Sequence, residues 1–253
     1  MIFNFSSASF RGRSFESVMS IASDSEPRDP VIGPLSLKNV QLCPQNCISP
    51  FTEDDALRLR EQYPDTAFRL HANARMSGRH LLADLSNYLR YRDYFQEIAN
   101  VSSVLGAQAY TVHPGAKRSG QPIQKILDNA DRLQDQMGVP VGIEGMYPVT
   151  AGGGFYFDSW EDYERLLAED CYFALDLSHA NILRTNSGVL NDALLREMAA
   201  SERCLEIHVS HNNGQKDEHC KFSSPDQYEW MIPIVDSAHH RTVIFYEGDL
   251  RRD

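Results

Sequence analysis

The chain has 253 residues, of which 42% are hydrophobic and 23% charged, so it has a globular composition and can bury a substantial core. Its formal net charge of -11 counts against a general nucleic-acid binder, because an acidic surface repels a polyanion. No stretch approaches the roughly 18 uninterrupted apolar residues of a membrane span, and the N-terminus lacks a secretory pattern. The five scattered cysteines argue against a disulfide framework. We therefore expect a cytoplasmic protein.

Short apolar runs rich in β-branched and aromatic residues recur along the chain, and each predicts a strand. In chain order they occupy residues 2–5, 40–43, 68–71, 109–113, 141–144, 172–176, 205–209 and 242–247. Helical patterns separate most of these strands. We predict helices over 53–62, 86–105, 122–137, 191–200 and 225–237, and one that begins near Asp158 or Ser159 and continues through Leu167. After the first strand we expect only a short helix within 14–22 and an irregular loop over 23–36.

Eight strands alternating with helices predict an α/β fold, a single parallel (β/α)8 TIM barrel that spans residues 1–253 as one domain. Only GDLRRD follows the last strand, so we expect no full final helix. An open doubly wound sheet is the alternative. That fold ordinarily carries a Gly-rich phosphate turn after its first strand, and FSSASFRGRSF is not such a turn.

Residues that can bind metals gather where the predicted strands end. The carboxyl ends of parallel barrel strands meet at one face, where the active sites of this fold are built. The ligand-type residues at these ends, or in the loops that follow, are His71, His113, Glu144, Asp176, His179, His208, Asp217, His219 and Glu247. A single strand-end histidine is more often a hydrogen-bonded core residue, and a strand-end acid is often a helix N-cap. The argument depends on six successive strands ending this way.

Four carboxylates in one cleft would repel each other and be driven to protonate, so bound cations are the economical explanation for their joint presence. Imidazole and carboxylate ligands without a required thiolate suit zinc, manganese or iron better than magnesium or calcium. Nine ligands are too many for one ion. We therefore expect two or three divalent ions, with zinc as the first expectation and manganese or iron as alternatives.

The same residues carry a family resemblance. The motifs are VHPG at 112–115, IEG at 143–145, ALDLSHAN at 174–181, IHV at 207–209 with DEH at 217–219, and FYEG at 245–248. In this order they resemble the strand-end motifs of endonuclease IV, a member of the xylose-isomerase-like TIM barrels (AP endonuclease family 2). The resemblance runs from about Val40 to Glu247 and covers all nine ligand positions, whereas the remaining sequence is only generally similar.

The resemblance implies a trinuclear site and cleavage of a phosphodiester. It assigns His71 and His113 to one ion, which Glu144 bridges to a second. It assigns Asp176, His208 and Glu247 to the second ion, and it assigns His179, Asp217 and His219 to the third. A hydroxide between the first two ions would attack phosphorus while the third stabilises the leaving group. Glu144, Asp176, His208 and Glu247 are thus the expected catalytic residues.

The sequence departs from that family in the loops expected to contact DNA. The loop after the third strand reads Ala72-Asn73-Ala74-Arg75-Met76, without the expected aromatic wedge, and CPQNCISPF lacks the basic, tryptophan-containing character of the family's other DNA loop. Arg75, His211 and Lys216 are the candidate substrate-binding residues. A positive rim could also be formed by Arg75, Arg79, Lys117, Arg118, Arg184 and Lys216. The metals are therefore better supported than DNA, and a small phosphate ester is an equally open substrate.

Three other functions stay open. A sugar isomerase or epimerase would need only Glu144, Asp176, His208 and Glu247 around one ion, with Glu144 and Glu247 exchanging protons beside a polarised carbonyl. A multinuclear iron oxidase acting on a peptide or small thiol could use the same ligands. A non-catalytic metal-binding module is the remaining alternative. We expect no membrane partner.

Overall fold

The structure is a computed structural model. It describes residues 1–44, 47, 49–72, 75–76, 79–80, 83–117, 120–149 and 153–251, with the backbone alone at 75–76 and 79–80.

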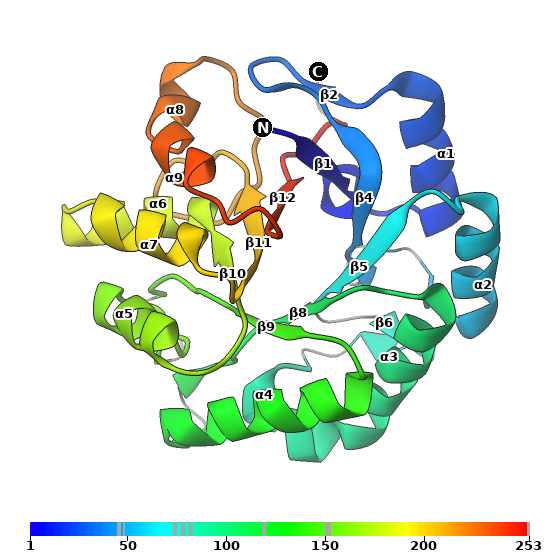
Figure 1. Cartoon of the computed structure of the whole chain (residues 1–253), viewed down its shortest axis with the longest axis horizontal. Helices are drawn as coiled ribbons and strands as arrows, with labels where there is room; N and C mark the ends of the chain where they lie inside the picture. Colours follow the sequence, from blue (N-terminus) through cyan, green and yellow to red (C-terminus); the bar gives the residue numbers. More distant parts are fainter. Residues whose placement is uncertain are drawn as a thin grey trace.

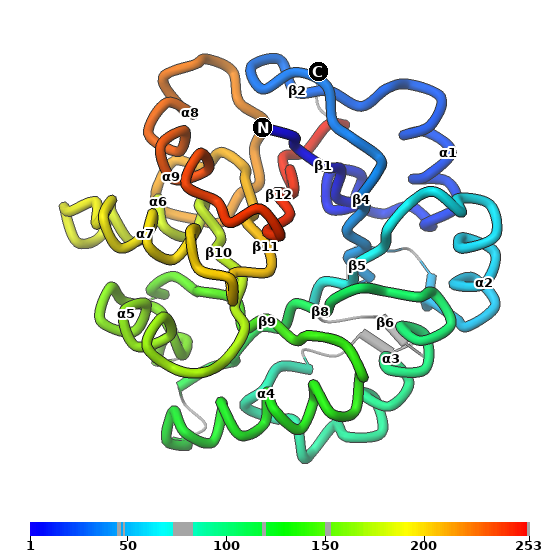
Figure 2. The backbone as a smooth tube through the Cα atoms, viewed as in Figure 1, coloured from blue at the N-terminus to red at the C-terminus, as the bar shows by residue number. Residues whose placement is uncertain are grey.

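Eight parallel strands form a closed barrel surrounded by helices (Figure 1). The strands are β1 (Phe3–Ser6), β4 (Ser36–Leu42), β5 (Ala67–His71), β8 (Tyr110–Val112), β9 (Val141–Glu144), β10 (Phe173–Asp176), β11 (Cys204–Val209) and β12 (Val243–Tyr246). The chain passes once around the ring in sequence order, and β1 pairs with both β4 and β12, so the first and last strands lie side by side (Figure 2). The predicted TIM barrel and its eight strands are confirmed.

Helices cover the outside of the barrel. They are α1 (Phe15–Ser25), α2 (Glu53–Gln62), α3 (Arg92–Leu105), α4 (Ile123–Met137), α5 (Trp160–Ala168), α6 (Leu177–Ser187), α7 (Asp192–Ala200), α8 (Asp226–Glu229) and α9 (Ile232–Asp236), with 3-10 helices η1 (Ser7–Phe10) and η3 (Leu85–Tyr91). Two short hairpins, β2 (Arg28–Asp29) with β3 (Gly33–Pro34) and β6 (Arg75–Met76) with β7 (Arg79–His80), lie outside the barrel sheet. None of the described helices is long and apolar enough to cross a membrane.

Local sequence signals explain where several helices begin and end. Thr52 caps α2 in a complete capping box with Asp55. Ser159, rather than Asp158, is the N-cap of α5, because its side chain accepts from the backbone N–H of Asp162. Gly106 ends α3 at a φ of 71°, a left-handed conformation that glycine adopts without strain.

Three predicted segments differ from the structure. The segment 86–105 is not one α-helix, because a 3-10 helix with a non-helical residue at Asn87 precedes α3. The segment 225–237 is divided into α8 and α9, and Pro233 at the start of α9 has no N–H to continue the preceding turn. The loop 23–36 contains the last turn of α1 and the β2–β3 hairpin. Helix α6 was not predicted.

The core lies between the strands and the helices. On α3, one apolar stripe is buried almost completely, since Tyr94, Phe95, Ile98, Val101 and Leu105 are each 3% exposed or less. Burying a large apolar side chain stabilises a fold by about 1.5–3 kcal/mol. This stripe therefore accounts for the position of α3 against the sheet. The barrel interior is different, because several of its inward-facing side chains are polar.

The carboxylate of Asp29 connects the β2–β3 hairpin to the loop after β11 by hydrogen bonds. Its Oδ1 accepts the backbone N–H groups of Val31 and Ile32 at 2.8 and 3.0 Å. Its Oδ2 accepts the N–H of Phe222 at 3.1 Å and the hydroxyl of Tyr246 at 2.5 Å. Asp29 is fully buried, and its bonds with Phe222 and Tyr246 form away from water. The segment after the first strand thus helps to position the loop that carries Asp217 and His219.

Candidate metal centre

A cavity of about 220 Å³ opens at the carboxyl ends of the barrel strands. It is lined by eight of the nine predicted ligands, His71, His113, Glu144, Asp176, His179, Asp217, His219 and Glu247, together with Ala8 and Arg11. The ninth, His208, lies in contact with Glu144 and is fully buried. The barrel therefore brings residues from six strands and their loops into one site.

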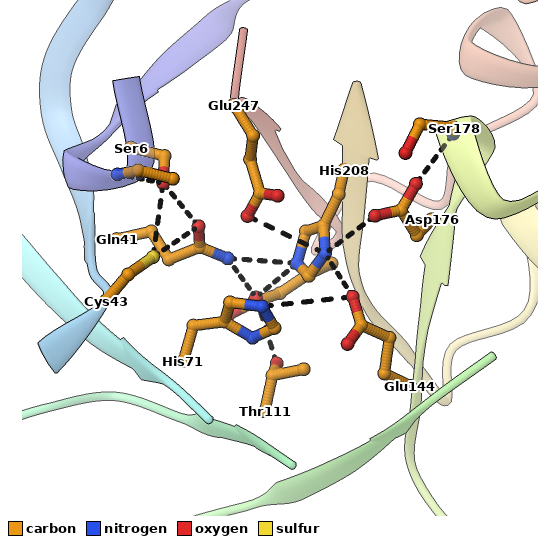
Figure 3. A network of polar contacts seen from close by, with 12 residues as sticks. Ser6, Gln41, Cys43, His71, Thr111, Glu144, Asp176, Ser178, His208 and Glu247 are labelled. Atoms are coloured by element: carbon orange, nitrogen blue, oxygen red, sulfur yellow. Dashed lines mark hydrogen bonds and ion pairs between the residues drawn. The ribbon is translucent and has the colours of Figure 1, made fainter. Parts of the chain in front are cut away.

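His208 is at the centre of this cluster (Figure 3). Its Nδ1 lies 2.9 Å from Glu144 Oε1, 3.9 Å from Asp176 Oδ2 and 3.8 Å from Glu247 Oε1. These three acids come from the ends of β9, β10 and β12, which are neighbours of β11 or one strand away. One nitrogen thus faces three carboxylates, an arrangement that suits a shared cation.

The other nitrogen of His208 faces a buried polar layer beneath the cavity. Glu206 Oε2 lies 3.0 Å from Nε2 and accepts hydrogen bonds from Gln41 Nε2 at 3.1 Å and Thr111 Oγ1 at 2.9 Å. Arg69 Nη1 lies 3.4 Å from the other carboxylate oxygen. Burial opposes ionisation of Glu206, but the hydrogen bond from His208 and the charge of Arg69 lower its pKa to about 2. The ionised carboxylate therefore favours a proton on Nε2. Burial opposes the charge of His208, but Glu247, Glu144 and Glu206 raise its pKa well above the usual value, so a cation that binds Nδ1 would displace a proton there.

Glu144 occupies a bridging position. Its Oε2 lies 2.8 Å from His113 Nε2, and its Oε1 lies 3.9 Å from His71 Nε2 and 2.9 Å from His208 Nδ1. The imidazole rings of His71 and His113 meet edge to face, with centroids 5.6 Å apart. This carboxylate can thus contact two ions at once, one on the side of His71 and His113 and one on the side of His208.

A further group surrounds Asp217. Its Oδ2 lies 2.9 Å from His219 Nε2 and 3.6 Å from His179 Nε2. His179 Nδ1 is 2.8 Å from the carbonyl oxygen of Gly145, so it donates to that oxygen and its Nε2 is left as the metal-binding nitrogen. His219 Nδ1 in turn lies 3.4 Å from Glu247 Oε2, which joins this group to the acids around His208.

Asp176 has two roles in the structure. Its Oδ1 caps α6 by accepting the N–H groups of Ser178 and His179 at 2.6 and 3.0 Å. Its Oδ2 points to the cavity, 3.7 Å from His179 Nε2. Because α6 begins directly after β10, the cap fixes the carboxylate and places His179 one helical turn from it.

Ligand atoms approach one another closely enough to hold cations. In each of three sets of residues, one ligand atom from every residue lies within 4.8 Å of the ligand atoms of the other two. The sets are His71, Glu144 and His208; Glu144, Asp176 and His179; and Asp176, His208 and Glu247. Glu144, Asp176 and His208 are each shared by two sets. In addition, Glu247 Oε1 is buried and has no hydrogen-bond donor among the described residues. A buried carboxylate oxygen in this state is a fitting cation ligand.

The pKa shifts of His71, His179 and Glu247 are also consistent with a cation site. Burial lowers the pKa of His71 to about 3, which keeps its imidazole neutral. Burial disfavours the charge on His179, but Asp176 and Asp217 raise its pKa to about 10. Burial raises the pKa of Glu247 to about 7, and the charges of Asp176 and Glu144 act in the same direction. Without cations, protons therefore balance the carboxylates, and divalent ions would displace protons when they bind.

Of the predicted substrate-binding residues, the two with described side chains, His211 and Lys216, do not line the cavity. Lys216 is exposed, and His211 pairs its backbone with Cys220 while its ring lies 6.0 Å from that of Phe222. Arg75 has its backbone in β6, but its side chain lies outside the described structure, as do Asn73, Ala74 and the side chain of Met76. Their roles stay predictions.

Two described members of the predicted positive rim contact residues away from the cavity. Lys117 pairs with Asp158 and Asp162 at 2.6 and 3.2 Å, and Arg184 stacks on Trp230 at 4.8 Å. Neither lines the cavity. Arg118 and the side chain of Arg79 lie outside the described structure.

Two groups of residues at the candidate site were not predicted. Glu206, Arg69 and Thr111 precede the predicted ligands His208, His71 and His113 by two positions. Strand side chains alternate between faces, so residues two apart share the inner face, and this spacing could have identified them. Arg11 lines the cavity from the loop after β1, for which no sequence signal was evident.

No family model and no curated protein matches the sequence. Solved structures do match. A D-tagatose 3-epimerase-like protein is 17% identical, with a TM-score of 0.66 over 98% of this chain and 91% of the other. The IolI protein with a bound zinc atom is 11% identical, with a TM-score of 0.63 over 99% and 90%. Endonuclease IV from Thermus thermophilus is 17% identical, with a TM-score of 0.57 over 96% and 90%.

These likenesses show the TIM-barrel fold, and several of the similar structures are described as xylose-isomerase-like. The similar structures include epimerases and an endonuclease. The fold alone therefore does not distinguish isomerisation from hydrolysis.

Proposed function

We propose that this protein is a divalent-metal-dependent hydrolase of phosphate esters that uses two or three ions. The observation that supports this function best is the position of Glu144 between His71 and His113 on one side and His208 on the other. A single-ion isomerase has no use for the first two histidines or for the group around Asp217. Zinc is the expected metal, since the ligands are imidazoles and carboxylates. We expect the protein to act in the cytoplasm.

The expected ligands are the nine residues predicted from the sequence. When bound, divalent ions supply Lewis-acid polarisation of a phosphoryl oxygen and lower the pKa of water. The protein's own contribution is orientation. Glu206 holds His208 with Nδ1 toward the cavity, and Gly145 holds His179 with Nε2 toward it. Burial of Glu144, Asp176 and Glu247 at 1% exposure excludes bulk water, which strengthens electrostatic interactions with a phosphoryl group.

The direct test is hydrolysis by metal-free protein reloaded with zinc or manganese. The substrates are bis(p-nitrophenyl) phosphate as a small diester and a duplex containing one abasic site. We expect metal-dependent cleavage of the small diester that is lost in Glu144→Gln. Cleavage of the duplex as well would extend the substrate range to DNA. No cleavage of either substrate by the fully loaded protein would overturn the proposal.

A sugar isomerase or epimerase is the second candidate, because one observation favours it. Glu144 and Glu247 both face Nδ1 of His208, yet their environments separate their proton affinities. Burial opposes ionisation of Glu144, but the neighbouring histidines hold its pKa well below the usual value, whereas that of Glu247 is raised to about 7. Such a pair can act as base and acid. Solvent deuterium incorporation next to the carbonyl of a ketose would support this candidate over hydrolysis.

A further inference from the structure

Arg11 is the only lysine or arginine among the described residues that line the cavity. It follows η1 in the loop after β1 and is partly buried. Its Nε is buried and makes no hydrogen bond to any described residue. An arginine with a buried, unpaired nitrogen beside a reaction cavity is available for a ligand.

Residues that follow β12 hold the backbone at Arg11 in place. Arg251 Nη1 donates to the carbonyl oxygen of Arg11 at 2.8 Å, and Asp249 fixes Arg251 through bonds of 2.9 and 2.8 Å. The N–H of Leu250 donates to the carbonyl oxygen of Ser9 at 3.1 Å. The loop of Arg11 is therefore tied to the segment that follows Glu247. This anchoring reduces the freedom that the loop would lose on binding a ligand.

The net charge of the cavity with divalent ions bound indicates that Arg11 can bind an anion. Glu144, Asp176, Asp217 and Glu247 contribute four negative charges when ionised. Two divalent ions contribute four positive charges and neutralise them, and a third ion makes the cavity positive. Arg11 is thus not needed to balance the ligands once two ions are present. Its charge is then available for an anion that enters with the substrate.

We propose that Arg11 binds the phosphoryl group of the substrate and that the substrate is a small, anionic phosphate ester. The planar guanidinium presents paired donors that match two oxygens of a phosphate. The cavity of about 220 Å³, which would also hold the ions, suits a compact phosphate group. This inference rests on the proposed function, because it takes the reacting group to be a phosphate.

Binding of inorganic phosphate to the zinc-loaded protein, measured by isothermal titration calorimetry, tests the role of Arg11. Arg11→Met should weaken phosphate binding about tenfold to a hundredfold, because a hydrogen bond to a charged group is lost. Arg11→Lys should recover part of the affinity, since it restores charge without the paired geometry. Arg13→Met is the matched control, an exposed arginine two residues along the same segment, and it should bind like the wild type.

Zinc content and the thermal midpoint of each variant are measured first. We expect Arg11→Met to keep the zinc content of the wild type. A loss of zinc in this variant would overturn the proposal, because Arg11 would then support the ligands rather than the substrate. Phosphate affinity in Arg11→Met equal to that of Arg13→Met would also overturn it.

Hydrolysis of bis(p-nitrophenyl) phosphate separates this inference from the proposed function. If the wild type cleaves the ester and Arg11→Met has the same KM and phosphate affinity, only the role of Arg11 fails. If the wild type cleaves no phosphate ester but phosphate binding depends on Arg11, the hydrolase proposal fails and the anion-binding role stands. Cleavage by the wild type with a raised KM in Arg11→Met is the result that we expect.

Discussion

Glu206 Oε2 lies 3.0 Å from His208 Nε2, on the side of the imidazole opposite Glu144. The two residues are two positions apart on β11, so both side chains point into the barrel. Arg69, Gln41 and Thr111 contact the same carboxylate from β5, β4 and β8. A buried polar layer formed by Glu206, Arg69, Gln41 and Thr111 therefore lies beneath the cavity and sets the orientation of His208.

This layer predicts that Glu206 controls metal affinity without being a ligand. Glu206→Gln should weaken zinc binding about tenfold to a hundredfold, because it removes the carboxylate that orients His208. Competition with a chromophoric chelator measures the affinity. Glu197→Gln is the control, since Glu197 is exposed on α7. Equal zinc affinity in the two variants would show that Glu206 has no such role.

The same substitution should destabilise the metal-free protein. It leaves Arg69 buried without its carboxylate, and breaking a buried ion pair costs about 3–5 kcal/mol. The free energy of unfolding in urea measures the loss. Replacing both partners, as in Glu206→Gln with Arg69→Met, should cost less than the sum of the single changes. Additive losses would contradict the pairing of Glu206 with Arg69.

Metal removal should lower thermal stability. A ligand that binds only the folded state at about a hundred times its Kd stabilises that state by about 2.7 kcal/mol. For a chain of this size, this corresponds to a fall in Tm of about 5–10 °C after chelation. Zinc or manganese should restore the Tm, whereas magnesium should not, because the ligands are rich in imidazole. A Tm that does not respond to any of these ions would argue against a metal centre.

Asp29 lies outside the cavity, but its hydrogen bonds should stabilise the position of the loop after β11. Asp29→Asn replaces an acceptor with an amide that cannot satisfy all four donors around it, and we expect a loss of about 3 kcal/mol in the free energy of unfolding. Urea titration measures it. Asp24→Asn is the control, because Asp24 is exposed at the end of α1. Equal stability of the two variants would mean that the Asp29 bonds do not hold the loop.

The barrel could be predicted from the sequence because eight short apolar runs separated by helical patterns leave few alternatives. The gathering of the nine predicted ligands at one face of the barrel could be predicted from the rule that parallel strands end at one face. Helix α6 was missed because LSHAN was interpreted only as a ligand motif. Asp176 as an N-cap and Gly188 as the C-terminal stop were the available signals.

Contacts between distant parts of the chain could not be predicted from the sequence. Glu206 and Arg69 lie 137 residues apart, and no local pattern indicates that they meet. Arg11 enters the cavity only because β1 and β12 are neighbours and Arg251 holds its backbone. Closure of the barrel, which is a property of the whole chain, creates both contacts.

The number of ions per chain tests the central claim most directly. Protein saturated with zinc and then desalted is analysed by inductively coupled plasma mass spectrometry, alongside Asp217→Ala/His219→Ala. His239→Ala/His240→Ala is the control, since these histidines contact each other and do not line the cavity. A multinuclear centre predicts at least two ions in the wild type and the control, and about one fewer in Asp217→Ala/His219→Ala. One ion per chain in the wild type, or the same number in all three proteins, would contradict it.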